Sequence, residues 1–254
     1  MTMLTPLAAF AAPRAVVPPP LSFARAAAWR PGLGGAPAHA EITAATREAS
    51  GAGLALALAL DALGDGDRSW LWVQDRAALR LSGRPYRPGL PASLRSRLVH
   101  VAARTPEDAL FALEEGLRCR DLAFVIGEIA GNPRALDFTA SRRLSLAVEQ
   151  HGIPLWLVRL DARRDLSSAR MRWEACAAPS LPPRWNAQAP GAPAWRAELF
   201  RARSHPPGEW IVREGGQGAA AAAGVRASTG SARADFESKA RSAQPALVEG
   251  RAHA

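Results

Sequence analysis

Between residues 39 and 214, uninterrupted apolar runs alternate with segments in which apolar residues recur every three or four positions. Runs of four or five consecutive apolar residues are typical of strands that are buried on both faces of a parallel sheet. Periodicity of three to four indicates helices that bury one side. We predict buried strands at Ser69–Val73, Leu122–Ile126 and Leu155–Val158, and a further strand at Leu98–Ala102.

Three helices are predicted, one before the first of these strands and two between them. Leu54, Leu56, Leu58 and Leu60 alternate with alanines, which suit a helix far better than a strand, so we expect a helix that is buried on two sides. A second helix starts at Thr105-Pro106-Glu107-Asp108, because threonine caps, proline fits the first turn and acids favour that end. The third covers Thr139–Gln150 and closes at Gly152.

The pattern changes after residue 170, where polar and apolar residues alternate. Met171, Trp173 and Ala175 alternate with charged residues, as do the residues of Trp195–Leu199, and Glu209–Arg213 follows a Pro-Pro-Gly turn. Such alternation predicts half-buried antiparallel strands at a sheet edge. The fold class is therefore α/β, with a mostly parallel sheet, helices on both faces and antiparallel C-terminal edge strands.

The ends of the chain differ in composition from this body. Residues 1–38 are rich in Pro and Ala, and residues 215–254 are low in complexity with few large apolar side chains. Neither stretch has enough apolar surface to offset the entropy of ordering, so we expect a disordered leader and a flexible tail. Within the body, residues 75–96 carry several Gly and Pro residues and are expected to be irregular.

Composition excludes several classes of protein. The net charge is +9, but residues 41–214 contain 24 arginines against 20 acids, which does not resemble a dedicated DNA-binding surface. Cys119 and Cys176 lack the clustered ligands of a structural zinc site and fit a reducing compartment. No apolar segment is long enough to span a membrane, so a cytoplasmic protein without metal or cofactor is expected.

A glycine-containing segment precedes the first helix, where a phosphate-binding protein of this layout would carry its phosphate loop. It comprises Ser50, Gly51, Ala52 and Gly53, after a possible strand at His39–Thr43. Gripping the outer phosphates and the magnesium ion requires a lysine followed by Ser or Thr, whereas the only lysine of the chain is Lys239 in the tail. Two interpretations remain open, a degenerate phosphate loop and an ordinary glycine turn.

Two further sets of residues are candidates for function. Glu128 ends the central apolar run, where a carboxylate can orient a water molecule or a metal ion, and the alternative is a solvated or salt-bridged glutamate. The C-terminal strands interleave Trp with Arg, a combination that is frequent in protein-interaction hot spots and in single-stranded DNA sites. Candidate contacts to a partner or to DNA are Arg172, Trp173, Trp195, Arg196 and Trp210, although the tryptophans also suit the core side of edge strands.

Several segments together, in their order and spacing, resemble the ImuA family of bacterial damage-response proteins, which are related to RecA. The most specific segment is Leu136-Asp137-Phe138-Thr139-Ala140-Ser141-Arg142-Arg143-Leu144. The others are Ala38–Ile42, Leu71–Val73, Pro85–Leu90, Pro106–Arg118, Gly127–Ile129, Trp195–Arg203 and Pro207–Trp210. The resemblance covers residues 39–213 and omits the leader and the tail.

This resemblance implies a RecA-like (P-loop NTPase-type) core over residues 39–214. It also implies an accessory role in mutagenic translesion DNA synthesis, as an adaptor that acts with RecA, with the polymerase-like ImuB and with an error-prone replicative-type DNA polymerase. The missing lysine agrees with a non-catalytic adaptor. The alternatives are a weak ATP-binding protein that uses Glu128 and a single-stranded-DNA-binding protein.

Overall fold

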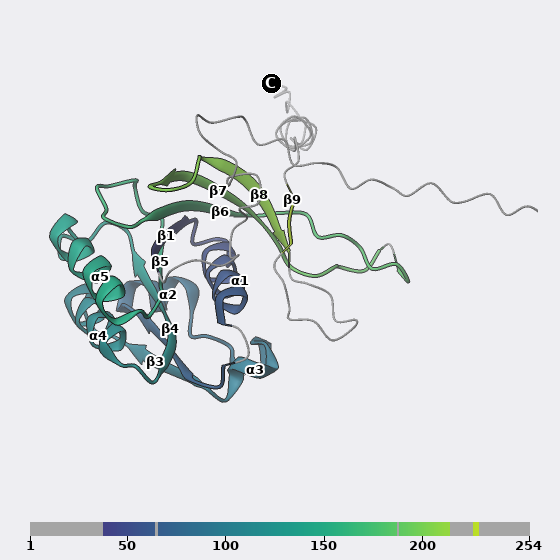
Figure 1. Cartoon of the computed structure of the whole chain (residues 1–254). Helices are drawn as coiled ribbons and strands as arrows, with labels where there is room; N and C mark the ends of the chain where they lie inside the picture. Colours follow the sequence, from purple (N-terminus) through teal and green to yellow (C-terminus); the bar gives the residue numbers. More distant parts are fainter. Residues whose placement is uncertain (1–37, 64–65, 187, 214–225, 229–254) are drawn as a thin grey trace, which may run out of the picture.

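A computed structural model describes residues 38–63, 66–186, 188–213 and 226–228. The described strands form one sheet in the order β3-β2-β4-β5-β1-β6-β7-β8-β9 (Figure 1). The strands are β1 (His39–Ala44), β2 (Ser69–Gln74), β3 (Leu98–Ala102), β4 (Leu122–Ala130), β5 (Leu155–Leu160), β6 (Met171–Ala177), β7 (Ala194–Ala202), β8 (Gly208–Arg213) and β9 (Arg226–Ser228). The helices are α1 (Ser50–Leu63), α2 (Arg76–Ser82), α3 (Ala92–Arg95), α4 (Pro106–Arg118) and α5 (Phe138–His151).

The sheet is parallel from β3 to β6 and antiparallel from β6 to β9. Helix α1 lies on one face, beneath the curved antiparallel strands, and α4 and α5 lie together on the other face (Figure 1). Each face has its own hydrophobic core. One contains Leu54, Trp70, Phe124, Trp173 and Leu199, and the other contains Leu113, Val125, Leu144 and Leu157. The α/β class, the mostly parallel sheet and the antiparallel C-terminal strands are therefore confirmed.

Local signals account for the predicted helices. Thr105 caps α4 by accepting a hydrogen bond from Asp108 N at 3.1 Å, and Leu110, Leu113 and Leu117 form its buried side. Helix α5 ends at Gly152, whose φ of 72° is the left-handed conformation that glycine adopts without strain. The predicted helix over Leu54–Leu60 is confirmed; Leu54 and Leu58 are buried, whereas Leu56 and Leu60 on the other side are partly buried and pack against the same core.

Two segments differ from the predictions. Residues 75–96 are not irregular throughout, because they contain α2, α3 and a 3-10 turn at Arg87–Gly89. Asp75 nucleates α2 by accepting a hydrogen bond from Ala78 N at 2.6 Å, and the Gly and Pro residues separate the short helices. Most of the predicted leader and tail lie outside the described residues, but Arg226–Ser228 forms β9 against β8, which the low-complexity pattern did not predict.

No described helix is both long and apolar enough to cross a membrane.

Candidate functional site

The carboxyl ends of the parallel strands form the edge of the sheet at which α/β proteins usually bind ligands. The connections that leave β1 and β2 run to the α1 face, and those that leave β4 and β5 run to the α5 face. The connection that leaves β3 also runs to the α5 face, so neighbouring connections diverge between β3 and β2, between β2 and β4, and between β5 and β1. Such switch points leave room for a ligand outside the strand ends. The β1–α1 junction and Glu128 each lie at one of them.

At the β1–α1 junction, the four candidate phosphate-loop residues lie in the first turn of α1 rather than in the loop before it. Ser50 is buried and donates its hydroxyl hydrogen to Ala175 O at 3.2 Å. A Cβ atom at Gly51 would lie 2.8 Å from both Ala44 Cβ and Val158 Cγ1. A Cβ atom at Gly53 would lie 2.5 Å from the indole nitrogen of Trp195. Close packing of α1 on the sheet and on β7 therefore explains both glycines.

The loop itself, residues 45–49, is held by carboxylates of the chain. Asp161, at the end of β5, accepts hydrogen bonds from the N–H of Thr46 at 3.0 Å and from its hydroxyl at 2.7 Å. These two bonds lower the pKa of Asp161. Glu48 accepts a hydrogen bond from the N–H of Ala177, the last residue of β6, at 2.6 Å. A phosphate at this loop would meet two carboxylates and find the Thr46 N–H already bound, which disfavours anion binding.

Glu128 belongs to a buried polar network at the switch point between β2 and β4. Its carboxylate accepts hydrogen bonds from Gln74 Nε2 at 2.7 Å and from Ser82 Oγ at 2.9 Å. Gln74 Oε1 in turn lies 2.8 Å from His100 Nε2. Burial raises the pKa of Glu128, and the hydrogen bonds from Gln74 and Ser82 oppose that rise. Glu128 is therefore neither solvated nor salt-bridged, and sequence reasoning missed Gln74 and Ser82 as its partners.

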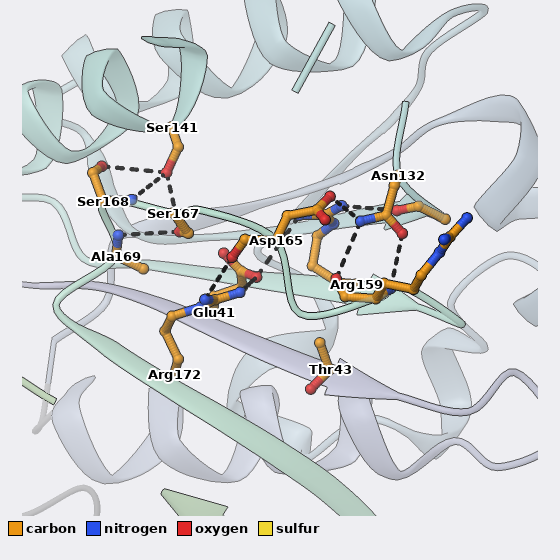
Figure 2. Close-up of polar contacts among 12 residues, drawn as sticks. Glu41, Thr43, Asn132, Ser141, Arg159, Asp165, Ser167, Ser168, Ala169 and Arg172 are labelled. Carbon is orange, nitrogen blue, oxygen red and sulfur yellow. Dashed lines mark hydrogen bonds and ion pairs between the residues drawn. The ribbon is translucent and has the colours of Figure 1, made fainter. Parts of the chain in front are cut away.

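A second buried polar cluster joins β5, β1 and β6 beneath the β5–β6 connection (Figure 2). Glu41 Oε1 lies 2.9 Å from Arg172 Nη2 and 3.7 Å from Arg159 Nη1, and all three side chains are almost fully buried. Arg172 Nη1 donates to Asp165 O at 2.7 Å, and Arg159 Nη2 donates to Gly131 O at 2.8 Å. Each arginine thus joins the glutamate to a loop at the carboxyl edge, which fixes both loops.

The two loops also contact each other directly. Asn132, in the β4–α5 loop, accepts a hydrogen bond from Arg163 N at 2.8 Å and donates to Arg163 O at 3.1 Å. Its amide also donates to the carboxylate of Asp165 (Figure 2). Sequence reasoning missed this cluster. The available signal was a charged residue inside an apolar strand, such as Glu41 in β1 or Arg159 in β5.

Beside this cluster, His39 and a group of serines join β1 and α5 to the β5–β6 connection. His39 Nδ1 lies 2.9 Å from Ser145 Oγ, and Ser145 Oγ lies 2.6 Å from Ser168 Oγ. Burial lowers the pKa of His39 to about 4, and the positive charges of Arg172 and Arg159 act in the same direction. His39 is therefore uncharged at neutral pH and forms part of the buried core.

The five candidate contact residues of the C-terminal strands divide into two groups. Arg172, Trp173 and Trp210 are buried, so the expectation that they meet a partner or DNA is corrected. Arg172 was expected to face solvent because it alternates with apolar residues, but the β5–β6 connection covers it. Trp195 and Arg196 are partly exposed, and Arg196 donates to Cys176 Sγ at 3.6 Å. Among the described residues, no group of three or more His, Cys, Asp or Glu side chains is placed to hold a metal ion.

Comparison with known proteins finds curated proteins that are similar to this chain. Protein ImuA of Caulobacter vibrioides (strain NA1000 / CB15N) and of Caulobacter vibrioides (strain ATCC 19089 / CIP 103742 / CB 15) are each 35% identical to this chain over 165 residues. The chain is thus similar to ImuA over this stretch. The match to ImuA covers 58% of this chain and 62% of each relative, so the chain spans less than two thirds of the curated relatives it matches. No protein-family model matches the chain.

Proposed function

We propose that this protein is a non-catalytic accessory protein of damage-induced mutagenic translesion DNA synthesis. The similarity to ImuA is the observation that carries this proposal. Within that role, the chain acts as an adaptor through contacts with RecA, with ImuB and with an error-prone replicative-type DNA polymerase. Its core is RecA-like, and the parallel sheet, the helices on both faces and the β1–α1 junction at the carboxyl edge support that assignment.

The β1–α1 junction supports a role without nucleotide hydrolysis. A working phosphate loop wraps its main-chain N–H groups around phosphate oxygens and adds a lysine. Here the junction has no lysine, and Asp161 and Glu48 accept the hydrogen bonds of Thr46 and Ala177. These carboxylates add negative charge where a triphosphate would bring more. In this proposal the layout is that of a nucleotide-binding fold, and carboxylates of the chain accept the N–H hydrogen bonds that a phosphate would otherwise accept.

Association with the proposed partners tests the adaptor role. Purified full-length protein is mixed with RecA and with ImuB, and binding is measured by pull-down and by biolayer interferometry. We expect the wild-type chain to bind at least one of them, and Arg196→Ala to weaken that binding while Arg76→Ala, an exposed arginine of α2, leaves it unchanged. Failure of the wild-type chain to bind either protein would refute the adaptor role.

Two competing functions give different results. An ATPase that uses Glu128 would bind a fluorescent ATP analogue and lose magnesium-dependent turnover in Glu128→Gln. A single-stranded-DNA-binding protein would show affinity that falls steeply with salt, because phosphate contacts release counterions. We expect neither nucleotide binding nor turnover from the wild-type chain.

A further inference from the structure

The antiparallel strands β6, β7 and β8 have one face in the core and one face outside it. Trp173, Leu199, Trp210 and Val212 point toward α1 and are buried. The opposite face lies on the same side of the sheet as α5, because Arg172 on that face of β6 bonds to Glu41 of β1. Helix α5 lies over β1 and β5, and the antiparallel strands extend beyond it (Figure 1). We call this uncovered side of β6–β8 the outer face.

A row of three glutamates crosses the outer face at right angles to the strands. Glu174 of β6 is paired in register with Glu198 of β7, and Glu198 is paired with Glu209 of β8. Neighbouring strands lie about 4.8 Å apart, so each carboxylate stands next to another. Like charges directly opposite each other on adjacent strands destabilise a sheet. The isolated chain therefore carries an unfavourable arrangement on a surface that no described helix covers.

The surrounding arginines neutralise this row incompletely. Arg164 forms an ion pair with Glu174, and Arg196 Nη1 lies 3.9 Å from Glu209 Oε1, at the limit of an ion pair. Among the described residues, the side chain of Glu198, in the middle, makes no hydrogen bond or ion pair, and it interacts electrostatically with Arg196. The side chains of Glu174 and Glu209 are 41% and 31% exposed. The charge of the row is thus accessible and partly unmatched, and the central carboxylate has the most to gain from a new partner.

Partly exposed uncharged side chains accompany the glutamates. Arg196 of β7 is paired in register with Ile211 of β8 on one side and with Cys176 of β6 on the other. Phe200 lies near the end of β7 on the same face, and the guanidinium carbon of Arg164 is 4.0 Å from its ring centroid. A surface that combines a few half-exposed apolar groups with a localised charge is typical of a protein interface. Nucleic acid is a poor match, because three carboxylates repel phosphate.

We propose that the outer face of β6–β8 is a docking surface for a protein partner that places arginine or lysine side chains against Glu174, Glu198 and Glu209. The proposal rests on the adaptor function proposed above and names the surface that serves it. Charge complementarity selects the occupant. The chain has a net charge of +9, so a cationic partner is repelled by the molecule as a whole and attracted only where acids gather. This local attraction gives the interface its specificity.

Neutralising the central glutamate tests the proposal, because it has opposite effects on the chain and on the complex. Glu198→Gln removes like-charge repulsion, so we expect a higher melting temperature for the isolated chain. The same variant removes an ion pair from the complex, so we expect binding to RecA or ImuB to weaken about threefold, and Glu198→Arg to weaken it about tenfold. The matched control is Asp121→Asn, an exposed acid in the α4–β4 turn, which should change neither quantity. A purely structural role for Glu198 would move stability and binding in the same direction.

A second probe separates failure of the docking surface from failure of the adaptor role. A short fluorescent peptide of alternating arginine and alanine is titrated into each variant at low salt. Wild-type binding that is lost in Glu198→Arg supports the acidic docking surface even if neither RecA nor ImuB binds. If the wild-type chain binds RecA or ImuB and neither Glu198 variant weakens that binding, the adaptor role stands and the docking surface is refuted. Binding of a single-stranded oligonucleotide that competes with the peptide would also overturn it, since the occupant would then be nucleic acid.

Discussion

Asp161 binds Thr46 through two hydrogen bonds, one from its N–H and one from its hydroxyl, and so joins the end of β5 to the loop that leads into α1. Asp161 has a φ of 50°, a left-handed conformation that aspartate and asparagine tolerate better than most residues. The left-handed backbone of Asp161 thus accompanies the two hydrogen bonds that its carboxylate accepts from Thr46. It lies at the loop where the proposed RecA-like core would otherwise bind phosphate.

Replacing Asp161 by asparagine should lower the melting temperature at neutral pH without disturbing the turn. Asparagine keeps the left-handed backbone but loses the charge that both donors of Thr46 bind. Because those hydrogen bonds lower the pKa of Asp161, its contribution to stability is present above the unfolded pKa of 3.8 and is lost as the pH falls further. The difference in melting temperature between the two proteins should therefore shrink as the pH falls below 3.8. Asp67→Asn, an exposed acid before β2, serves as the control.

Gly53 and Trp195 should show strong coupling in a double-mutant cycle. Alanine normally stabilises a helical glycine position by about 1 kcal/mol. Here its Cβ would lie 2.5 Å from the Trp195 indole, so we expect Gly53→Ala to cost about 1 to 3 kcal/mol instead. In a Trp195→Leu background most of that cost should disappear, because the indole is gone. Urea unfolding of the four proteins measures the coupling, and additive effects would contradict the close contact between α1 and β7.

Buried His39 should make stability rise with pH on the acid side of neutrality. Its pKa is about 4 in the folded chain and 6.5 when unfolded, so the unfolded state binds the extra proton between these values. Stability is then lowest near pH 4 and rises until about pH 6.5, by at most about 3 kcal/mol. His39→Asn preserves a polar atom near Ser145 and should flatten this part of the profile. A slope that is unchanged in His39→Asn would assign it to other groups.

Glu128 should behave in the opposite way. Burial raises its pKa, so ionisation favours the unfolded chain, and stability falls as the pH rises from about 4.5 through the folded pKa. Glu128→Gln removes this effect and should stabilise the protein by about 1 kcal/mol at pH 7. Glu128→Ala removes one acceptor each from Gln74 and Ser82, which keep Gly83 O and Ala78 O, and should cost about 1 to 2 kcal/mol. Loss of stability in the glutamine variant would show that the buried charge itself is required.

The sequence predicted the elements whose causes are local. Thr105 and Pro106 marked the start of α4, Gly152 marked the end of α5, and continuous apolar runs marked the central strands. Helix α2 was missed because glycine and proline immediately after it masked a short segment that Asp75 caps. The family resemblance is confirmed by the similarity to ImuA.

The sites were harder to predict because their partners lie far apart along the chain. Glu41 and Arg172 are separated by 131 positions, and only the parallel pairing of β1 with β6 brings them together. Alternation in β6 correctly indicated two faces, but it did not show that the β5–β6 connection buries Arg172. Similarly, Gly51 and Gly53 suggested a loop, whereas glycine is required there because α1 packs closely against Val158 and Trp195.

One hydrophobic core extends under both halves of the sheet, from Trp70 of β2 through α1 to Val212 of β8. The C-terminal strands are therefore not a detachable module. A shortened chain that ended after β5 would leave the apolar side of α1 in water and lose part of the packing of the parallel strands as well. Substitutions between the two halves of the sheet are thus tolerated only at surface positions. Loss of the last strands should unfold the whole domain rather than remove a single contact.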